Sequence, residues 1–299
     1  MFGKIILKPK TPFLSQLQSD TIFGNFAWGY RYIFGEDELK KRLKEEFITF
    51  SNGFFKGFLP RPFFKPYFDD DINKDVKKTS ILPKKIVFDL IDKFDRGELD
   101  INSQTPEAMI VEYLKNAKFE KVKKEDVIIQ KNSINRLTNR TNEKLYSLKE
   151  EYIDAEFEIY FKTSLDKNEV EEVFKFIEKR GFGKDKSVGK GRGEWKIEWD
   201  FEEKKYFEKK GKYFLNLSMM IKNENDKLIY GKTITKFPKS GGIYAYSNPF
   251  KNPFIAFLPG SIFESANPGK LVEIVDGIYQ NGRAVGIYFG EERWGLNLK

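Results

Sequence analysis

The chain has 299 residues, of which 40% are hydrophobic and 33% are charged, and its formal net charge is +8. It contains no cysteine and no histidine, which excludes disulfides, thiolate nucleophiles, Cys/His zinc sites and imidazole general bases. The length predicts about two domains, and the basic balance favours an acidic partner such as nucleic acid or a membrane surface.

The sequence has no feature typical of secretion or membrane insertion. It holds no run of about 18 apolar residues, and no small-residue cleavage site follows the short apolar run Ile5–Leu7. We therefore expect a cytoplasmic protein with no membrane partner.

The first part of the chain predicts two helices between short strands. The expected elements are a strand at Lys4–Lys8, a helix at Thr21–Gly35, a second helix at Glu36–Phe50 and an edge strand at Lys56–Leu59. Ser19 and Asp20 have the side chains that cap a helix amino terminus. Leu39 and Leu43 lie at helical spacing in the second helix.

An aromatic and proline-rich stretch, Gly53–Pro66, follows. Its three prolines exclude a central strand or a helix interior. Its aromatic rings either stack on single-stranded bases or pack in an interface or core, and packing is the favoured interpretation. The triplet Asp69–Asp71 is able to recruit Mg²⁺, although carboxylates in such loops are usually solvated. Thr105 and Pro106 then begin a helix that runs to about Lys115.

Residues Val122–Leu148 have no helical period and predict a long hairpin or arm. The polar cluster SINRLTNRT, Ser133–Thr141, lies near its expected tip. Arginine pairs with phosphate through two hydrogen bonds or stacks on a base, and Asn and Thr add short hydrogen-bonding groups. The candidate RNA-binding residues of the arm are Lys131, Asn135, Arg136, Thr138 and Arg140. The alternative is an ordinary solvated hairpin tip.

A strand, a helix and another strand are expected next. Residues Tyr152–Phe161 alternate between apolar residues and the acids Asp154, Glu156 and Glu158, which predicts a strand with one solvated face. Asp166 and Glu169 form a capping-box pattern for a helix that ends before Gly181. Trp195–Phe201 alternates as a further strand.

The segment between that helix and strand, Gly181–Gly193, reads GFGKDKSVGKGRG and is the strongest functional signal. Glycines let the backbone approach a ligand closely, and Lys/Arg attract phosphate oxygens. The helix–loop–strand order excludes a P-loop and a Rossmann fingerprint. The candidate RNA-binding residues are Gly183, Lys184, Lys186, Ser187, Gly189, Lys190, Gly191 and Arg192. The alternative is a flexible basic turn that binds nothing.

The carboxyl-terminal part predicts mainly strands. They are expected at Tyr213–Ile221, Gly242–Tyr246, Phe254–Leu258 and Ala284–Phe289, with a short helix near Leu271. Arg283 lies in a glycine-flanked turn, from which it either reaches an RNA or serves only the turn.

Together the elements predict an α+β protein. The order β–α–β–insert–β–α–β is that of a ferredoxin-like (RRM-like) sheet. We expect a first ferredoxin-like domain at residues 1–205, with an insert at about 60–151 that carries the basic arm. A second, degenerate ferredoxin-like domain is expected at 206–299.

An ordered set of motifs resembles the RAMP superfamily of CRISPR proteins. It is most similar to the family formed by the fourth subunit of type III-A Csm complexes, in the Cas-five-like group. The motifs are SDTIFGNFAWGY (Ser19–Tyr30), FLPRPFF (Phe58–Phe64), SINRLTNRT, FGKDKSVGKGRGEW (Phe182–Trp195), LPGSIF (Leu258–Phe263) and GRAVGIYF (Gly282–Phe289). The glycine-rich motif marks only the superfamily, whereas the ordered set points to this subunit.

The resemblance implies two ferredoxin-like domains that clasp the 5′ handle of a crRNA. It implies contact with a large polymerase/cyclase-like subunit on one side and a backbone RAMP subunit on the other, without catalysis and without a cofactor. By position, Lys184, Ser187, Lys190 and Arg192 would hold handle phosphates, and the arm cluster would lie near the handle. Asn139 stands where the family often has glycine, and Asn tolerates left-handed backbone better than most residues.

Two alternatives stay open at this point. One is a metal-independent crRNA-processing endoribonuclease of the same superfamily, which would have to use Tyr, Ser or Lys because histidine is absent. The other is a scaffold whose loops contact only proteins. The absence of an evident carboxylate cluster favours a protein that binds RNA and is not an enzyme.

Overall fold

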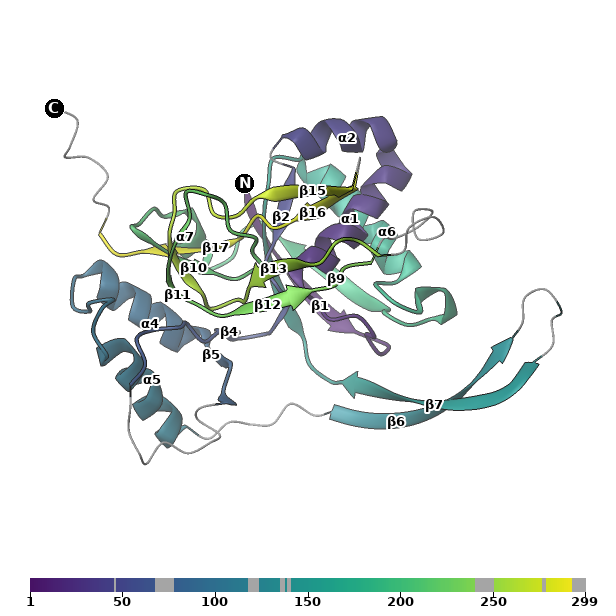
Figure 1. Ribbon diagram of the computed structural model, residues 1–299, viewed down its shortest axis with the longest axis horizontal. Coiled ribbons are helices and arrows are strands. Elements are labelled where there is room, and N and C mark those ends of the chain that lie inside the picture. Colours follow the sequence, from purple (N-terminus) through teal and green to yellow (C-terminus); the bar gives the residue numbers. More distant parts are fainter. Residues whose placement is uncertain are drawn as a thin grey trace.

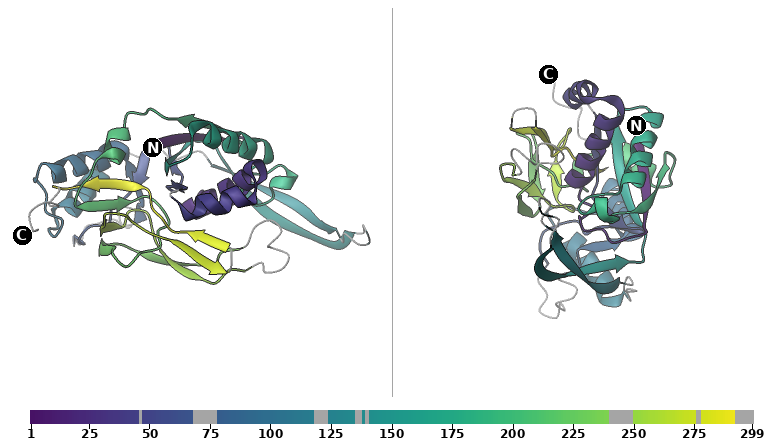
Figure 2. Two further views of the ribbon diagram at one scale, coloured as in Figure 1. Left: turned by 90° about the horizontal axis from the view of Figure 1, so that it is seen from above. Right: turned by 90° about the vertical axis from the view of Figure 1, so that its right-hand side faces the viewer.

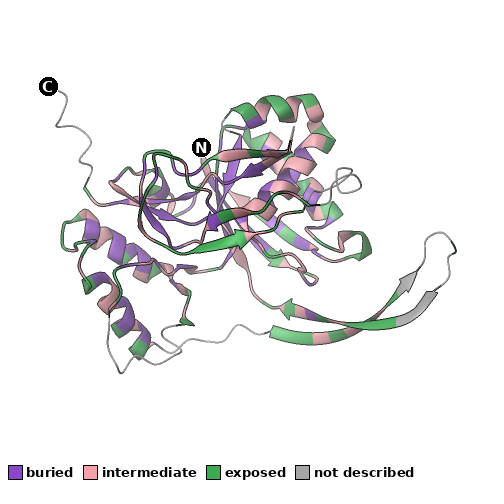
Figure 3. Cartoon of the chain, viewed as in Figure 1, coloured by how far each residue is buried: buried purple, intermediate pink, exposed green. Residues whose placement is uncertain are grey.

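The computed structural model describes residues 1–45, 47–67, 78–117, 124–134, 138, 141–239, 250–275 and 278–291. It consists of a body of packed sheets and helices from which one long two-stranded arm extends (Figure 1). Residues of the body are largely buried or half-buried, whereas most described residues of the arm are exposed (Figure 3).

Helices and short antiparallel strands make up the described chain, which confirms the α+β class. The helices are α1 (Ser19–Phe34), α2 (Glu36–Lys44), α4 (Lys84–Asp95), α5 (Thr105–Asn116), α6 (Lys167–Arg180) and α7 (Lys204–Glu208), with a 3₁₀ turn η1 (Lys186–Val188). The strands of the first half are β1 (Phe2–Pro9), β2 (Ile48–Phe50), β3 (Phe54–Phe55), β4 (Phe58–Pro60), β5 (Ile81–Pro83), β6 (Lys124–Ile134), β7 (Thr141–Ile153), β8 (Phe157–Thr163) and β9 (Gly193–Glu198). Those of the second half are β10 (Tyr213–Asn216), β11 (Lys227–Tyr230), β12 (Thr233–Lys236), β13 (Phe254–Phe257), β14 (Ile262–Glu264), β15 (Leu271–Val275), β16 (Ile278–Asn281) and β17 (Gly286–Phe289).

The first sheet has the strand order β2-β8-β1-β9, with β3 paired to β8, and every neighbouring pair is antiparallel. Helices α1 and α6 pack on one face of it (Figure 2), where Phe26 and Phe174 meet Ile5 and Phe161 in one buried cluster. The capping box predicted for Asp166 and Glu169 is confirmed at the start of α6. The predicted order β–α–β–insert–β–α–β is therefore present in this sheet.

The other face of the first sheet is also covered. A second buried cluster joins Tyr160 of β8 to Ile91 of α4, Ile110 of α5, and Leu215 and Ile287 of the carboxyl-terminal strands. Those strands form a sheet in the order β11-β14-β10-β17. The insert helices and the second sheet thus share one core with the first.

Because both faces are covered, the expectation of a solvated acidic face on β8 is wrong for Glu158. Its side chain is only 2% exposed. It accepts hydrogen bonds from the Lys84 ammonium, the Tyr160 hydroxyl and the amide of Gly57 at 3.0–3.3 Å. Lys84 also pairs with Glu203, so this ionic cluster connects the first sheet, the start of α4 and the segment before α7. A buried carboxylate is tolerated only with such partners.

Several predicted boundaries in the amino-terminal part are wrong. The helix expected at Glu36–Phe50 ends at Lys44, because the ITF sequence of β2 pairs with β8. The edge strand expected at Lys56–Leu59 is broken by a turn at Gly57, where φ is +87°. Likewise the strand expected at Tyr152–Phe161 is interrupted between β7 and β8.

The predicted cap of α1 is also wrong. The N-cap position is occupied by Gln18. The Ser19 hydroxyl accepts a hydrogen bond from the amide of Met219 at 2.8 Å, and Asp20 pairs with Lys236 at 2.9 Å. Both side chains therefore join the start of α1 to the carboxyl-terminal part.

In that part, the helix expected near Leu271 is wrong, since Leu271–Val275 is strand β15, paired with β16. Its sequence LVEIV is rich in β-branched residues, which favour strands. Strands β10, β13 and β17 lie within three of the predicted segments. The strand expected at Gly242–Tyr246 lies outside the described residues.

Candidate nucleic-acid interface

The glycine-rich loop folds back onto itself after α6. The amide of Phe182 donates to the carbonyl of Gly191 at 2.9 Å, and the amide of Gly191 donates to the carbonyl of Pro12 at the same distance. Gly191 has φ +66°, and a Cβ atom there would lie 2.0 Å from the Phe182 carbonyl oxygen. Glycine is therefore required at this position for the loop to close.

The loop is also fastened to the segment around the start of α1. The amide of Lys184 donates to Ser15 Oγ at 2.9 Å, and that of Gly183 donates to Asn25 Oδ1 at 3.3 Å. A Cβ atom on Gly183 would lie 2.5 Å from Ser15 Cβ. The glycines thus allow close packing within the protein. The sequence analysis had instead attributed them to the close approach of a ligand.

Most amides of the loop are therefore already used. Those that donate to protein acceptors belong to Gly181, Phe182, Gly183, Lys184, Val188, Gly189, Lys190, Gly191 and Arg192. Within the described part of the chain, the amides of Asp185, Lys186 and Ser187 donate no hydrogen bond. Only this short stretch of the loop presents free N–H groups to a ligand.

The root of the arm docks on the loop through buried charges. Glu150 of β7 is 0% exposed and pairs with Lys190 of the loop. Lys131 of β6 lies 3.6 Å from Glu150 and 3.0 Å from Asp185. The hydrogen bond from Lys131 to Asp185 raises the pKa of the lysine. Lys131 and Lys190, both predicted to bind RNA, thus have carboxylate partners within the protein.

The remaining cations of the loop differ in their surroundings. Lys184 and Ser187 are exposed. Lys186 is half-buried, and burial, together with the nearby Arg180 charge, lowers its pKa. Arg192 donates to the carbonyl of Lys179. Lys184, Lys186 and Arg192 form no ion pair with any residue that the structure describes, whereas Lys190 is paired with Glu150.

An aromatic and arginine cluster that the sequence interpretation missed lies on α1 and α6. Tyr32 has its ring centroid 6.0 Å from that of Trp28 and 5.8 Å from that of Phe176. The Arg180 guanidinium lies 4.5 Å from the Tyr32 centroid. Tyr32 is 51% exposed. The i, i+4 spacing of Trp28 with Tyr32 and of Phe176 with Arg180 was the available signal.

The arm is the predicted hairpin, formed by β6 and β7 in antiparallel register. Of its candidate tip residues, Thr138 is exposed, whereas Asn135, Arg136 and Arg140 lie outside the described residues. Arg283 is not brought to this site. Its guanidinium donates to the carbonyl of Glu45, beside β2, at 3.0 Å. The glycine-rich loop leads into β9, and β2 and β9 are the opposite ends of the first sheet.

The Phe/Pro stretch packs against the protein, as the favoured interpretation expected. Phe64 is buried and stacks on Phe94 of α4 with ring centroids 5.6 Å apart. The amide of Phe63 donates to the carbonyl of Gly260 at 2.8 Å. These contacts join the insert to the carboxyl-terminal part.

The described ranges contain no group of three or more acidic side chains arranged to hold a metal ion. The triplet Asp69–Asp71 lies outside those ranges. None of the described helices has the length and apolar character that crossing a membrane requires.

Comparison with solved structures finds chains of the same fold. One is a chain of the Csm3-Csm4 subcomplex in the type III-A CRISPR-Cas interference complex, with a TM-score of 0.63 and 19% identity over 96% of this chain and 99% of that one. Chains of the Csm1-Csm4 cassette in complex with AMPPNP and with cA4 have TM-scores of 0.53 and 0.55 at 13% and 12% identity. Each of these covers 98% of this chain and all of its own.

The chain therefore has the fold of subunits found in type III CRISPR complexes. This confirms, at the level of the fold, the resemblance that the sequence motifs predicted. No protein-family model matches the sequence, and no curated protein matches it either.

Proposed function

We propose that the chain is an RNA-binding, non-catalytic subunit of a type III CRISPR effector complex of the Csm kind. It holds the 5′ handle of the crRNA and links the large polymerase/cyclase-like subunit to the backbone RAMP subunits. The observation that carries the proposal is the likeness of fold, over nearly the full length, to a chain of the Csm3-Csm4 subcomplex. The ordered sequence motifs support the same assignment.

The domain assignment belongs to this proposal. The first sheet, with α1 and α6 on one face, is the ferredoxin-like domain of residues 1–205, and the insert adds α4, α5 and the arm. The second sheet, β11-β14-β10-β17, is the core of a degenerate domain at 206–299. The similar solved structures are complexes that contain Csm3 or Csm1, which supports contact with two partner subunits.

The proposed RNA site lies where the glycine-rich loop meets the arm. Lys184, Lys186 and Ser187 contact phosphates directly, because two of them are exposed and none is used in an ion pair. Lys131 and Lys190 position the arm through Glu150. The loop geometry depends on Gly183, Gly189 and Gly191, and Arg192 borders the site. Four residues near the tip extend the site along the arm: Asn135, Arg136, Thr138 and Arg140. Arg283 contacts RNA elsewhere.

Four tyrosines are poor candidates for the base of the ribonuclease alternative. A tyrosine that replaces histidine as a general base needs a lowered pKa. Burial instead raises the pKa of Tyr30, Tyr206 and Tyr288 to about 12. The pKa of Tyr160 is raised well above 10, again by burial. These four side chains therefore do not fit that role.

The experiment is to sequence the RNA that copurifies with the chain from cells carrying its CRISPR array. A single shared 5′ end, within the repeat-derived sequence, is expected. Random fragments or no RNA would contradict handle binding.

A further inference from the structure

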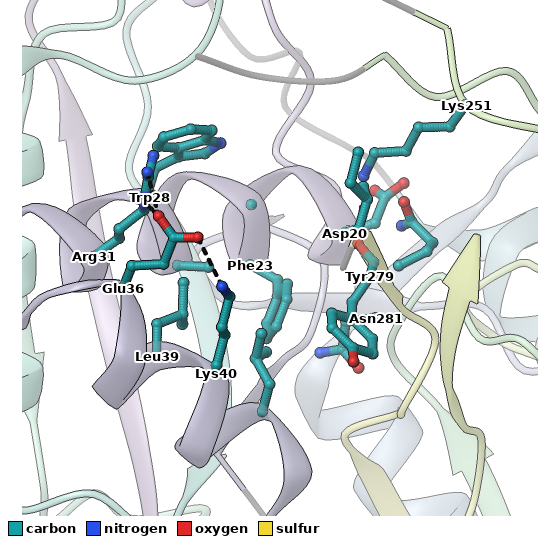
Figure 4. Close-up of a pocket in the computed structure, with 15 residues that line it drawn as sticks. Asp20, Phe23, Trp28, Arg31, Glu36, Leu39, Lys40, Lys251, Tyr279 and Asn281 are labelled. Atoms are coloured by element: carbon teal, nitrogen blue, oxygen red, sulfur yellow. Dashed lines mark hydrogen bonds and ion pairs between the residues drawn. The ribbon is translucent and has the colours of Figure 1, made fainter. Parts of the chain in front are cut away.

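A small cavity of about 140 Å³ lies between α1, α2 and β16 (Figure 4). Its apolar lining includes Phe23 and Ala27 of α1 and Leu39 and Leu43 of α2. At one end, Glu36 accepts hydrogen bonds from Arg31 and pairs with Lys40 at 3.0 Å. The cavity is thus a slot with apolar sides and charged ends.

The opposite end contains the amide side chain of a largely buried residue. Gln280 of β16 lines the cavity and is only 5% exposed. Its amide atoms are not among the fully buried polar atoms that lack a partner in the described chain. The amide offers donors and an acceptor to an occupant of the cavity.

A lysine faces the same end (Figure 4). Lys251 donates to the carbonyl of Tyr279 at 3.3 Å, and burial lowers its pKa, although the Asp20 charge opposes that shift. Asp20 itself pairs with Lys236. Lys251 is therefore a half-buried cation without a carboxylate at ion-pair distance in the described chain, and it can donate further hydrogen bonds.

The size and the polar groups together limit the occupant. An apolar cavity of about 150 Å³ holds one benzene ring, whereas sites for larger ligands start at about 300 Å³. The slot therefore fits a single ring. The Gln280 amide offers donors and an acceptor, and Lys251 offers a further donor. Cytosine and uracil both present two acceptors and one donor on the Watson–Crick edge, which complements this set.

We propose that this slot takes one pyrimidine base of a bound single-stranded RNA, with its ring between α1 and α2 and its edge toward Gln280 and Lys251. The inference rests on the proposed function. An apolar or aromatic side chain from a protein partner would fit the walls, but it would not pair with the Gln280 amide.

The slot lies next to the loop that the phosphates are proposed to contact. Helix α1 separates α6 from the β15–β16 hairpin (Figure 2). Gly24 lines the slot, and the next residue, Asn25, holds the amide of Gly183 in the loop. One RNA strand that passes the start of α1 can therefore contact both.

The test measures binding of the full chain to labelled oligoribonucleotides rU8, rC8 and rA8 by fluorescence anisotropy at one fixed salt concentration. The natural chain should prefer rU8 and rC8. Gln280→Met and Lys251→Met should each weaken binding of the pyrimidine oligomers by about fivefold or more, since a good pair of base contacts contributes about 1–3 kcal/mol. Binding of rA8 should change little. Gln104→Met, which replaces a glutamine in the insert, is the matched control.

Thermal unfolding of each variant shows whether it folds. Because Gln280 lies in β16 and Lys251 precedes β13, the test stays decisive if one of the two variants fails to fold. Equal ranking of the three oligomers by the natural chain, or a preference that survives both substitutions, would overturn the pyrimidine site. Failure of the natural chain to bind any of the RNAs would instead contradict the proposed function itself. Crosslinking of 5-iodouridine RNA to Phe23 or Tyr279 would support the site directly, and crosslinks confined to the arm would contradict it.

Discussion

Glu150 of the arm and Lys190 of the glycine-rich loop form an ion pair in which the carboxylate is completely buried. Lys131, on the neighbouring strand of the arm, lies close to the same carboxylate and pairs with Asp185 of the loop. A two-stranded ribbon is only marginally stable alone. These contacts therefore hold the arm and loop in one arrangement, and they explain why Lys190 of the loop and Lys131 of the arm have carboxylate partners within the protein.

Replacing Glu150 tests that arrangement. Glu150→Gln leaves two lysines without their shared carboxylate, and removing one partner of a buried pair typically costs about 3 kcal/mol. We expect faster hydrogen exchange in the amides of β6 and β7 and little change in α6. Glu151→Gln is the control, because its pair with Lys124 is largely exposed. Unchanged exchange in the arm after Glu150→Gln would show that this pair does not hold it.

Lys184 and Lys190 of the loop should affect the salt dependence of RNA binding differently. Lys184→Ala removes an exposed, unpaired charge, so the slope of log affinity against log salt should fall by about 0.7 for a single-stranded ligand. Lys190→Ala removes a charge that Glu150 already neutralises. It should weaken binding through the arm while the slope stays nearly constant. Equal slope changes in the two variants, measured by anisotropy between low and high salt, would contradict this division.

Two glycines of the loop provide a matched test of its closure. Both Gly189 and Gly191 have positive φ, at +87° and +66°. A Cβ atom on Gly189 meets nothing within 4 Å, whereas one on Gly191 would lie 2.0 Å from a backbone oxygen. Gly189→Ala should cost about 1 kcal/mol from the backbone alone. Gly191→Ala should cost about 3 kcal/mol or more in urea unfolding, because backbone must move. Similar costs for both would show that the loop is not closed in this way.

The ionic cluster around Glu158 predicts a pH dependence of stability. Burial alone would raise the pKa of Glu203, but hydrogen bonds from Lys84 and its own backbone, with the nearby Lys84 and Lys4 charges, keep it below the ordinary 4.5. A carboxyl whose folded pKa is depressed stabilises the protein above its unfolded pKa, and this contribution is lost as pH falls through the folded pKa.

Lys84→Met should therefore destabilise the protein most near neutral pH, since the charged Glu203 then keeps only Lys4 as its lysine partner among the described residues. The difference from the natural chain should shrink as pH falls through the folded pKa of Glu203, which lies below the ordinary 4.5. Chemical unfolding at several pH values measures this, with the exposed neighbour Lys85→Met as control. A difference independent of pH would mean that Lys84 acts only through its aliphatic chain.

Local patterns in the sequence predicted the first sheet well. The spacing of Val170, Val173 and Ile177 with its capping box is a local signal, and the hairpin of the arm is formed by adjacent segments. Glu158 was misassigned because an acid in an alternating strand normally indicates solvent, whereas here the insert and the second sheet cover that face. The helix α4 was missed although Val87, Leu90, Ile91 and Phe94 have helical spacing.

The candidate site was predicted only in part. The composition of the glycine-rich loop identified the segment, but composition does not tell whether a glycine serves a ligand or a close contact such as that between Gly183 and Ser15. The slot beside α1 gave no signal, because Phe23, Leu39, Lys251 and Gln280 come from distant segments and meet only in the folded chain.

Binding of handle-containing RNA, measured across a salt series and followed by a denaturing gel of the same samples, tests the central claim most directly. The account predicts affinity that falls linearly on a log–log salt plot, a smaller slope for Lys184→Ala combined with Lys186→Ala, and intact RNA on the gel. Affinity that does not depend on salt, or cleavage of the RNA at a single position, would contradict it.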